Sequence, residues 1–115
     1  TFLEDLPQKI HNTDREIVPA AQFIGSRYMD DITAEDIAAA AGYSPNYLCR
    51  KFREAAGVSV HEYLVFIRLQ RAALELMTTD DSVTDIALRC GFSGSNYFKD
   101  AFKKKYGVTP SEYRK

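Results

Sequence analysis

Two short segments of this sequence concentrate its basic side chains. They are Arg50, Lys51 and Arg53 in the first segment, and Lys99, Lys103, Lys104 and Lys105 in the second. Such clusters can contact phosphate, and local charge decides that contact because salt screens charges beyond about 10 Å at 0.1 M. Lysine runs are also typical of solvated helix faces. The clusters therefore indicate phosphate binding only if other features agree.

The other residue types that can do chemistry lack a recognisable arrangement. Cys49 and Cys90 have no zinc-ligand spacing with His11 or His61. The sequence contains neither a phosphate-binding glycine loop nor a His-Glu metal motif. We therefore expect no enzyme activity, no metal site and no cofactor. Isolated thiols are typical of a reducing cytoplasm, and redox sensing through Cys49 is an alternative for that residue.

Length and composition describe an ordinary globular chain. Its 115 residues, 45% of them hydrophobic and 27% charged, suffice for one compact domain or for two small halves that share a core. No apolar run approaches the roughly 18 residues of a membrane span, and no signal peptide is visible, so we expect a cytoplasmic protein. The net charge is −1, but residues 1–32 carry three basic and six acidic groups, whereas the remainder carries 12 basic and 10 acidic groups.

Helix start and stop signals recur along the chain and predict an all-α fold. Four pairs place a hydroxyl at an N-cap and a carboxylate three residues later: Thr33 with Asp36, Ser59 with Glu62, Ser82 with Asp85, and Thr109 with Glu112. Ser44 followed by Pro45 begins a further helix, and glycines mark helix ends at 42, 57, 91 and 107. About seven helices result, at roughly 17–29, 33–41, 45–56, 60–78, 83–90, 95–106 and 110–114.

The helix predicted at residues 60–78 is the longest, about 28 Å at 1.5 Å per residue. Its apolar residues form two stripes: Tyr63, Ile67, Leu74 and Met77 in one, and Phe66, Leu69, Ala73 and Leu76 in the other. A helix at a protein surface needs only one apolar stripe. We therefore expect this helix to pack on two sides and to connect two halves.

Residues 36–63 and 85–113 form an internal repeat. An offset of 49 repeats Asp36, Ile37, Ala38, Gly42 and Ser44; after one extra residue, an offset of 50 repeats Asn46, Tyr47, Phe52, Gly57, Val58, Glu62 and Tyr63. These 12 identities in a window of 28 residues are too many for coincidence. In each copy a small alanine lets two helices approach, and a glycine four residues later permits a sharp turn. The repeat predicts two helix-turn-helix units, each clamped by buried residues: Ile37, Leu48 and Phe52, then Ile86, Phe98 and Phe102.

The second copy carries a specific signature. It consists of Asp85-Ile86-Ala87, Gly91-Phe92-Ser93, Tyr97-Phe98, Phe102-Lys103 and the run from Gly107 to Arg114. Together with Gly57 to Tyr63 and with Arg68, Ala72 and Leu74 to Leu76, it resembles the DNA-binding domain of the AraC-type transcriptional regulators over about residues 17–115. The resemblance implies two helix-turn-helix subdomains bridged by a long helix. Their recognition helices, 45–56 and 95–106, would enter adjacent major-groove segments of double-stranded DNA.

Matching the family's motif assigns roles to individual residues. The implied base-contacting residues are Asn46, Cys49 and Arg50 in the first recognition helix, and Ser95, Asn96 and Lys99 in the second. Arginine can donate two bonds to guanine, asparagine can pair with adenine, and a lysine can serve guanine. Phosphate contacts are expected from Lys51, Arg53, Lys103 and Lys104, and from backbone N–H groups at Ser44 and Ser93. Asp100 departs from the family, which often has a basic residue there, and Tyr47 and Tyr97 are expected in the core.

The predicted organisation follows from the repeat and from the first residue, Thr1, which suggests a fragment of a longer protein. Residues 1–16 are expected to be a linker or tail, 17–58 and 79–115 the two subdomains, and 59–78 the connecting helix. RNA polymerase is a further candidate partner, and an effector would act only through a domain absent from this chain. The alternative function is a protein-interaction module of the same fold that no longer binds DNA. Whether the protein activates or represses stays open.

Overall fold

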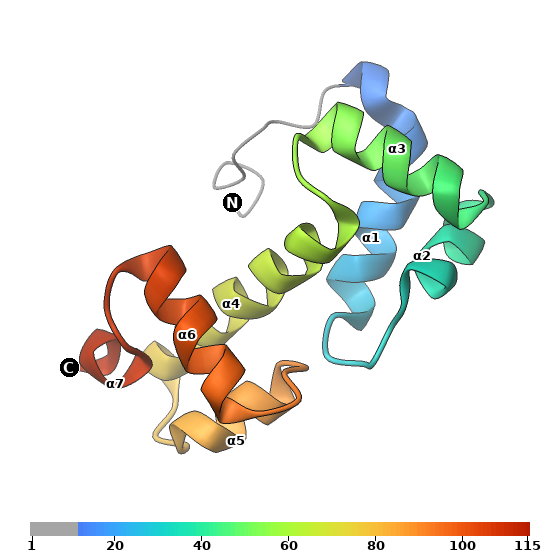
Figure 1. Ribbon diagram of the computed structural model, residues 1–115. Coiled ribbons are helices and arrows are strands. Elements are labelled where there is room, and N and C mark those ends of the chain that lie inside the picture. Colours follow the sequence, from blue (N-terminus) through green and yellow to red (C-terminus); the bar gives the residue numbers. More distant parts are fainter. Residues whose placement is uncertain (1–11) are drawn as a thin grey trace. The chain divides into compact units, whose positions relative to one another are not determined.

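The computed structural model describes residues 12–115 and is helical without strands over that range (Figure 1). The elements are the 3-10 helix η2 (Asn12–Ile17) and the α-helices α1 (Val18–Arg27), α2 (Ala34–Ala41), α3 (Pro45–Ala56), α4 (Val60–Thr78), α5 (Val83–Arg89), α6 (Ser95–Tyr106) and α7 (Pro110–Arg114). The predicted all-α fold with its seven α-helices is thus confirmed. Part of the predicted tail, residues 1–11, lies outside the described residues, and residues 12–16 belong to η2.

Side-chain caps begin the helices where the sequence predicted them. Thr33 and Thr109 form complete capping boxes with Asp36 and Glu112. Ser59 and Glu62 do the same at the start of α4, where the Glu62 carboxylate accepts from the Ser59 backbone N–H at 2.9 Å. Each box satisfies N–H groups that the first turn leaves without an intrahelical partner. None of the described helices is both long and apolar enough to cross a membrane.

The chain divides into two compact units, and the boundary between Ile67 and Arg68 lies inside α4. In the first unit, η2, α1, α2, α3 and the start of α4 surround a core that includes Ile24, Ile37, Leu48, Phe52 and Tyr63, each at most 1% exposed. The Phe52 and Tyr63 rings meet edge to face with centroids 5.2 Å apart, which ties α3 to α4.

The second unit has an aromatic core. Phe98 contacts Phe92 and Phe102, and Phe102 contacts Tyr113 of α7 edge to face at 5.3 Å. The Arg114 guanidinium donates to the backbone oxygens of Leu76 at 3.1 Å and Thr79 at 3.0 Å. These bonds satisfy carbonyl groups at the end of α4 and fasten α7 to it.

A helix-turn-helix is present in each unit and has the same turn in both. Ala38 and Ala87 are buried, and Gly42 and Gly91 adopt positive φ angles of 82° and 102°. The residue after each glycine donates its N–H back to the buried alanine, at 2.9 Å in the first unit and 3.0 Å in the second. The alanine–glycine pairs therefore do what the sequence predicted: they allow close approach and a left-handed helix end.

The apolar stripes of α4 were predicted only in part. Tyr63 and Ile67 of one stripe are buried, and so are Leu69, Ala73 and Leu76 of the other. Leu74 and Met77, however, are 48% and 62% exposed, so the first stripe is not buried along its whole length. The physical reason is that α4 contributes to both units. The side of the helix that is buried changes where the chain passes from the first unit to the second.

Candidate nucleic-acid interface

The first predicted recognition helix, α3, separates buried and exposed side chains cleanly. Leu48, Phe52 and Ala56 are buried, whereas Asn46, Cys49 and Arg50 are exposed. Because successive residues turn by about 100° around a helix, Asn46 and Arg50 lie away from the core and Cys49 lies at its edge. The structure therefore brings the three predicted base-contacting residues of this helix together on an accessible surface.

Arg50 lies over the ring of Tyr47, with its guanidinium carbon 5.4 Å from the ring centroid. Tyr47 in turn contacts the ring of Tyr43 at 4.9 Å. Tyr47 was expected in the core, but it is only half-buried and forms a platform at the edge of α3. A cation over an aromatic face is attracted to it, so Tyr47 restricts the freedom of Arg50.

Glu16, at the end of η2, is a residue that sequence reasoning missed. Its Oε2 atom accepts from the Tyr47 hydroxyl at 3.2 Å and lies 3.2 Å from the Lys51 ammonium nitrogen. The hydrogen bond with Glu16 raises the pKa of Lys51 above its usual range. Lys51, predicted to contact phosphate, is thus already paired within the first unit. No local spacing could have revealed this pair, because 35 residues separate its members in the sequence.

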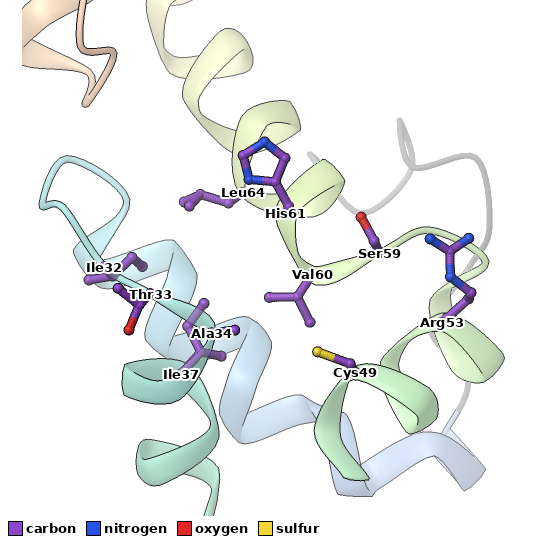
Figure 2. A pocket seen from close by; sticks show the side chains of 10 residues that line it. All are labelled: Ile32, Thr33, Ala34, Ile37, Cys49, Arg53, Ser59, Val60, His61 and Leu64. Atoms are coloured by element: carbon purple, nitrogen blue, oxygen red, sulfur yellow. The ribbon is translucent and has the colours of Figure 1, made fainter. Parts of the chain in front are cut away.

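A pocket of about 360 Å³ lies beside α3 at Cys49 and Arg53. Figure 2 shows the thiol of Cys49 beside the apolar side chains of Ile37 and Val60, with Arg53 and His61 at the edges. Arg53 is exposed, and its Nη2 atom lies 3.8 Å from a Glu62 oxygen. Cys49 therefore offers a small, mostly apolar contact, as its residue type suggested, and Arg53 keeps an accessible guanidinium.

The second predicted recognition helix, α6, repeats this arrangement with differences. Phe98 and Phe102 are buried, Asn96 and Lys99 are exposed, and Ser95 is half-buried. Tyr97 was expected in the core, but it is 50% exposed and touches Phe92 only at a ring separation of 6.0 Å. Asn96 and Lys99 are thus accessible on α6, whereas Ser95 lies on the same side of the helix as the buried Phe102, seven residues later.

The two recognition helices begin differently. At α3 the Ser44 hydroxyl is the N-cap and accepts from the Tyr47 N–H at 3.3 Å. At α6 the N-cap is Gly94, which offers no side-chain oxygen, and Ser93 lies one residue before it. The extra residue of the second repeat explains this difference between the two helices. Beyond this turn, Lys103, Lys104 and Asp100 are all exposed on α6.

The second cysteine has a structural environment. Cys90 is fully buried, and its thiol donates to a Glu75 oxygen at 3.5 Å, while Arg89 donates to another Glu75 oxygen at 2.7 Å. Burial raises the pKa of the Cys90 thiol to about 12, so the group stays protonated near neutral pH and is a poor nucleophile. Among residues 12–115 no cluster of His, Cys, Asp and Glu is arranged to hold a metal ion.

Comparison with known proteins agrees with this architecture. A family model described as a helix-turn-helix domain matches residues 37–115. The HTH-type transcriptional regulator MtrA of Neisseria gonorrhoeae is 37% identical over 102 residues, which are 89% of this chain and 34% of that protein. The chain thus spans about a third of the length of this relative.

Solved structures show the same fold. An AraC-type transcriptional regulator from Chromobacterium violaceum superposes with a TM-score of 0.84 at 28% identity, covering 89% of this chain and 91% of that one. The DNA-binding domain of AdpA, solved with a target DNA, gives a TM-score of 0.78 at 29% identity, covering 84% and 89%. The chain belongs to the AraC-type family of helix-turn-helix DNA-binding domains.

Proposed function

We propose that this domain binds double-stranded DNA sequence-specifically and serves transcription regulation, with α3 and α6 entering adjacent segments of the major groove. The observation that carries the proposal is the duplicated geometry: two equal alanine–glycine turns each present a helix whose polar face points away from its core. An α-helix fits the major groove, where base edges are distinguishable. The DNA complex of the similar AdpA domain supports the same interpretation.

The chemistry of the two faces suggests a division of base contacts. Arg50 can donate two hydrogen bonds to guanine O6 and N7, and Asn46 and Asn96 can pair with adenine N6 and N7. Lys99 would serve guanine as a single charge, while Ser95 and Cys49 would make smaller contacts. Arg50 is the residue from which we expect the strongest base discrimination, because a bidentate contact fixes both partner and orientation.

Phosphate contacts would hold the domain in register without selecting a sequence. We propose Arg53, Lys103 and Lys104 for this role, because all three are exposed. The first turn of α3 at Ser44 would offer backbone N–H groups, and Ser93 would contribute from the turn before α6. Lys51 would join them only after leaving Glu16. RNA polymerase and an effector that acts through another domain stay predictions for the full-length protein.

A pair of alanine variants separates base from phosphate contacts. We expect Arg50→Ala to weaken binding to a preferred duplex by about 1–3 kcal/mol and to relax the preference at one base pair. Lys103→Ala should weaken binding to all duplexes alike. It should also make the slope of log K against log salt shallower by about one, because one phosphate contact is lost. Fluorescence anisotropy with a set of single-base-pair variants of the duplex, between 50 and 200 mM salt, measures both effects.

Two results would contradict the proposal. Equal, sequence-independent losses from both variants would show that Arg50 does not contact bases. Affinity that does not fall as salt rises would exclude phosphate binding and favour the alternative of a protein-interaction module, whose apolar contacts release no counterions.

A further inference from the structure

We propose that Glu16 of η2 limits the sequence-independent affinity of α3 for DNA, because it pairs with Lys51 and so withholds one cation from the phosphates. The inference rests on the proposed function. Glu16 lies outside both recognition helices, and it acts through Lys51 rather than through any contact of its own with DNA.

The geometry joins one carboxylate to two residues of α3. A single oxygen of Glu16, Oε2, lies 3.2 Å from the Lys51 ammonium and accepts from the Tyr47 hydroxyl at the same distance. Tyr47 and Lys51 are four residues apart and therefore stand one above the other on one flank of the helix. Glu16 thus occupies that flank of α3 rather than meeting a single mobile side chain.

The segment that carries Glu16 is anchored. The next residue, Ile17, is 1% exposed and belongs to the core of the first unit. η2 packs on both α1 and α3. Because the backbone beside Glu16 is fixed by this burial, part of the entropy cost of forming the pair is already met by folding. The pair is partly exposed and therefore weak, so removing the carboxylate releases Lys51 for phosphate at little cost in stability.

The contact also divides the cations of α3 by role. Tyr47, held by Glu16, lies under the guanidinium of Arg50. Lys51 is paired with the Glu16 carboxylate, whereas Arg50 stays exposed on the face that we assign to the bases. Withholding a phosphate contact lowers the affinity for every sequence by the same factor, and it leaves the base contacts of Arg50 unchanged.

The recognition helix of the second unit has no basic residue at the position that corresponds to Lys51. At the offset of 50 residues that relates α3 to α6, the position of Lys51 is occupied by Ala101. Tyr97, which corresponds to Tyr47, is half exposed. Neither recognition helix therefore presents a free cation at this position: α6 has none, and α3 has one that is neutralised by Glu16.

The test is a double-mutant cycle with the 115-residue chain. The variants are Glu16→Gln, Lys51→Gln and the double variant, and Kd is measured from 50 to 200 mM salt on a duplex of random sequence and on a preferred duplex. We expect Glu16→Gln to bind both duplexes several-fold more tightly, with a salt slope steeper by about 0.9 and an unchanged ratio between the two affinities. Lys51→Gln alone and the double variant should both keep the salt slope of the unmodified chain.

A matched control removes the same charge elsewhere. Glu35→Gln changes an exposed acid of α2 in the same unit and reports the general effect of one negative charge fewer. The inference is overturned if Glu16→Gln matches Glu35→Gln, or if its effect persists in the Lys51→Gln background. It is equally overturned if Lys51→Gln alone lowers the slope by about 0.9, because Lys51 would then contact phosphate in the unmodified chain.

The cycle also separates this inference from the proposed function. If the unmodified chain shows no salt-dependent binding to either duplex, the proposed function fails and the role of Glu16 fails with it. If the chain binds and Arg50→Ala relaxes the base preference, while the two substitutions in the cycle are additive, only the role of Glu16 is wrong.

Discussion

Arg50 and Lys51 are neighbours in the sequence, yet the structure gives them different surroundings. Arg50 lies over the Tyr47 ring and its guanidinium is exposed, whereas Lys51 forms an ion pair with Glu16. Both are basic residues of one helix, and composition alone would treat them alike. The direction of each side chain around α3, with the element that packs on that side, decides which cation is available to a ligand.

Glu62 links a single residue to the pH dependence of stability. The Ser59 backbone N–H and hydroxyl lower the pKa of Glu62 below its usual range. A carboxylate with a lowered folded pKa stabilises the fold above its unfolded pKa, about 4.3, and this contribution disappears as pH falls through the folded pKa. We expect Glu62→Gln to lower the free energy of unfolding near neutral pH and to cost less at more acidic pH, as measured by urea unfolding at a series of pH values.

The control for this prediction is Glu35→Gln. Glu35 is also an acid in the first turn of a helix, but the capping box of α2 uses Asp36. The two substitutions share the loss of a charge near a helix N-terminus, but only Glu62→Gln removes the charge of a carboxylate that accepts a capping hydrogen bond. A pH-independent cost of Glu62→Gln, or an equal effect of both substitutions, would show that the charge of the capping carboxylate contributes nothing measurable.

At the scale of elements, the turn between α2 and α3 depends on backbone conformation more than on space. Gly42 has a φ of 82°, and a Cβ added there would meet nothing within 4 Å. We expect Gly42→Ala to lower the free energy of unfolding by about 1–2 kcal/mol, because the left-handed region strains any L side chain. Gly25 lies within α1 and its Cβ would also meet open space. Gly25→Ala should raise the stability by about 0.5 kcal/mol.

Urea unfolding of the two variants decides this point, and opposite signs are the expected result. Because neither methyl group would touch a neighbour, packing cannot account for a difference between them. Two substitutions of equal effect would mean that helix propensity and turn geometry do not control this part of the fold.

Local patterns predicted most of these elements. The caps at Thr33, Ser59, Ser82 and Thr109 depend on atoms three residues apart, and the structure contains all four. The six residues predicted to clamp the two units are all buried. The family resemblance assigned base contacts to six residues of α3 and α6, of which five are exposed and Ser95 is half-buried, and their contacts with bases stay a prediction.

Longer-range features could not be predicted in this way. Glu16 meets Lys51 only because η2 packs on α3, and neither segment contains a pattern that predicts this contact. The exposure of Leu74 and Met77 depends on where α4 passes from one unit to the next.

For the whole molecule, the duplication is the feature with most functional consequence. Each unit has its own core and its own helix-turn-helix, and α4 contributes to both. A single chain with two recognition helices could contact two segments of one DNA face, which most helix-turn-helix proteins achieve as dimers. Asp100 is exposed on α6 at a position where the family often has a basic residue. Its negative charge argues against an equal contribution of the second unit to DNA binding.

Selection from a randomised duplex pool, followed by sequencing at two salt concentrations, tests this account most directly. We predict enrichment of a site with two conserved blocks about 10 base pairs apart, one for each recognition helix, because adjacent major-groove segments on one DNA face recur at that spacing. A single enriched block would contradict the claim that α3 and α6 both contact bases. No enrichment at either salt concentration would contradict sequence-specific DNA binding itself.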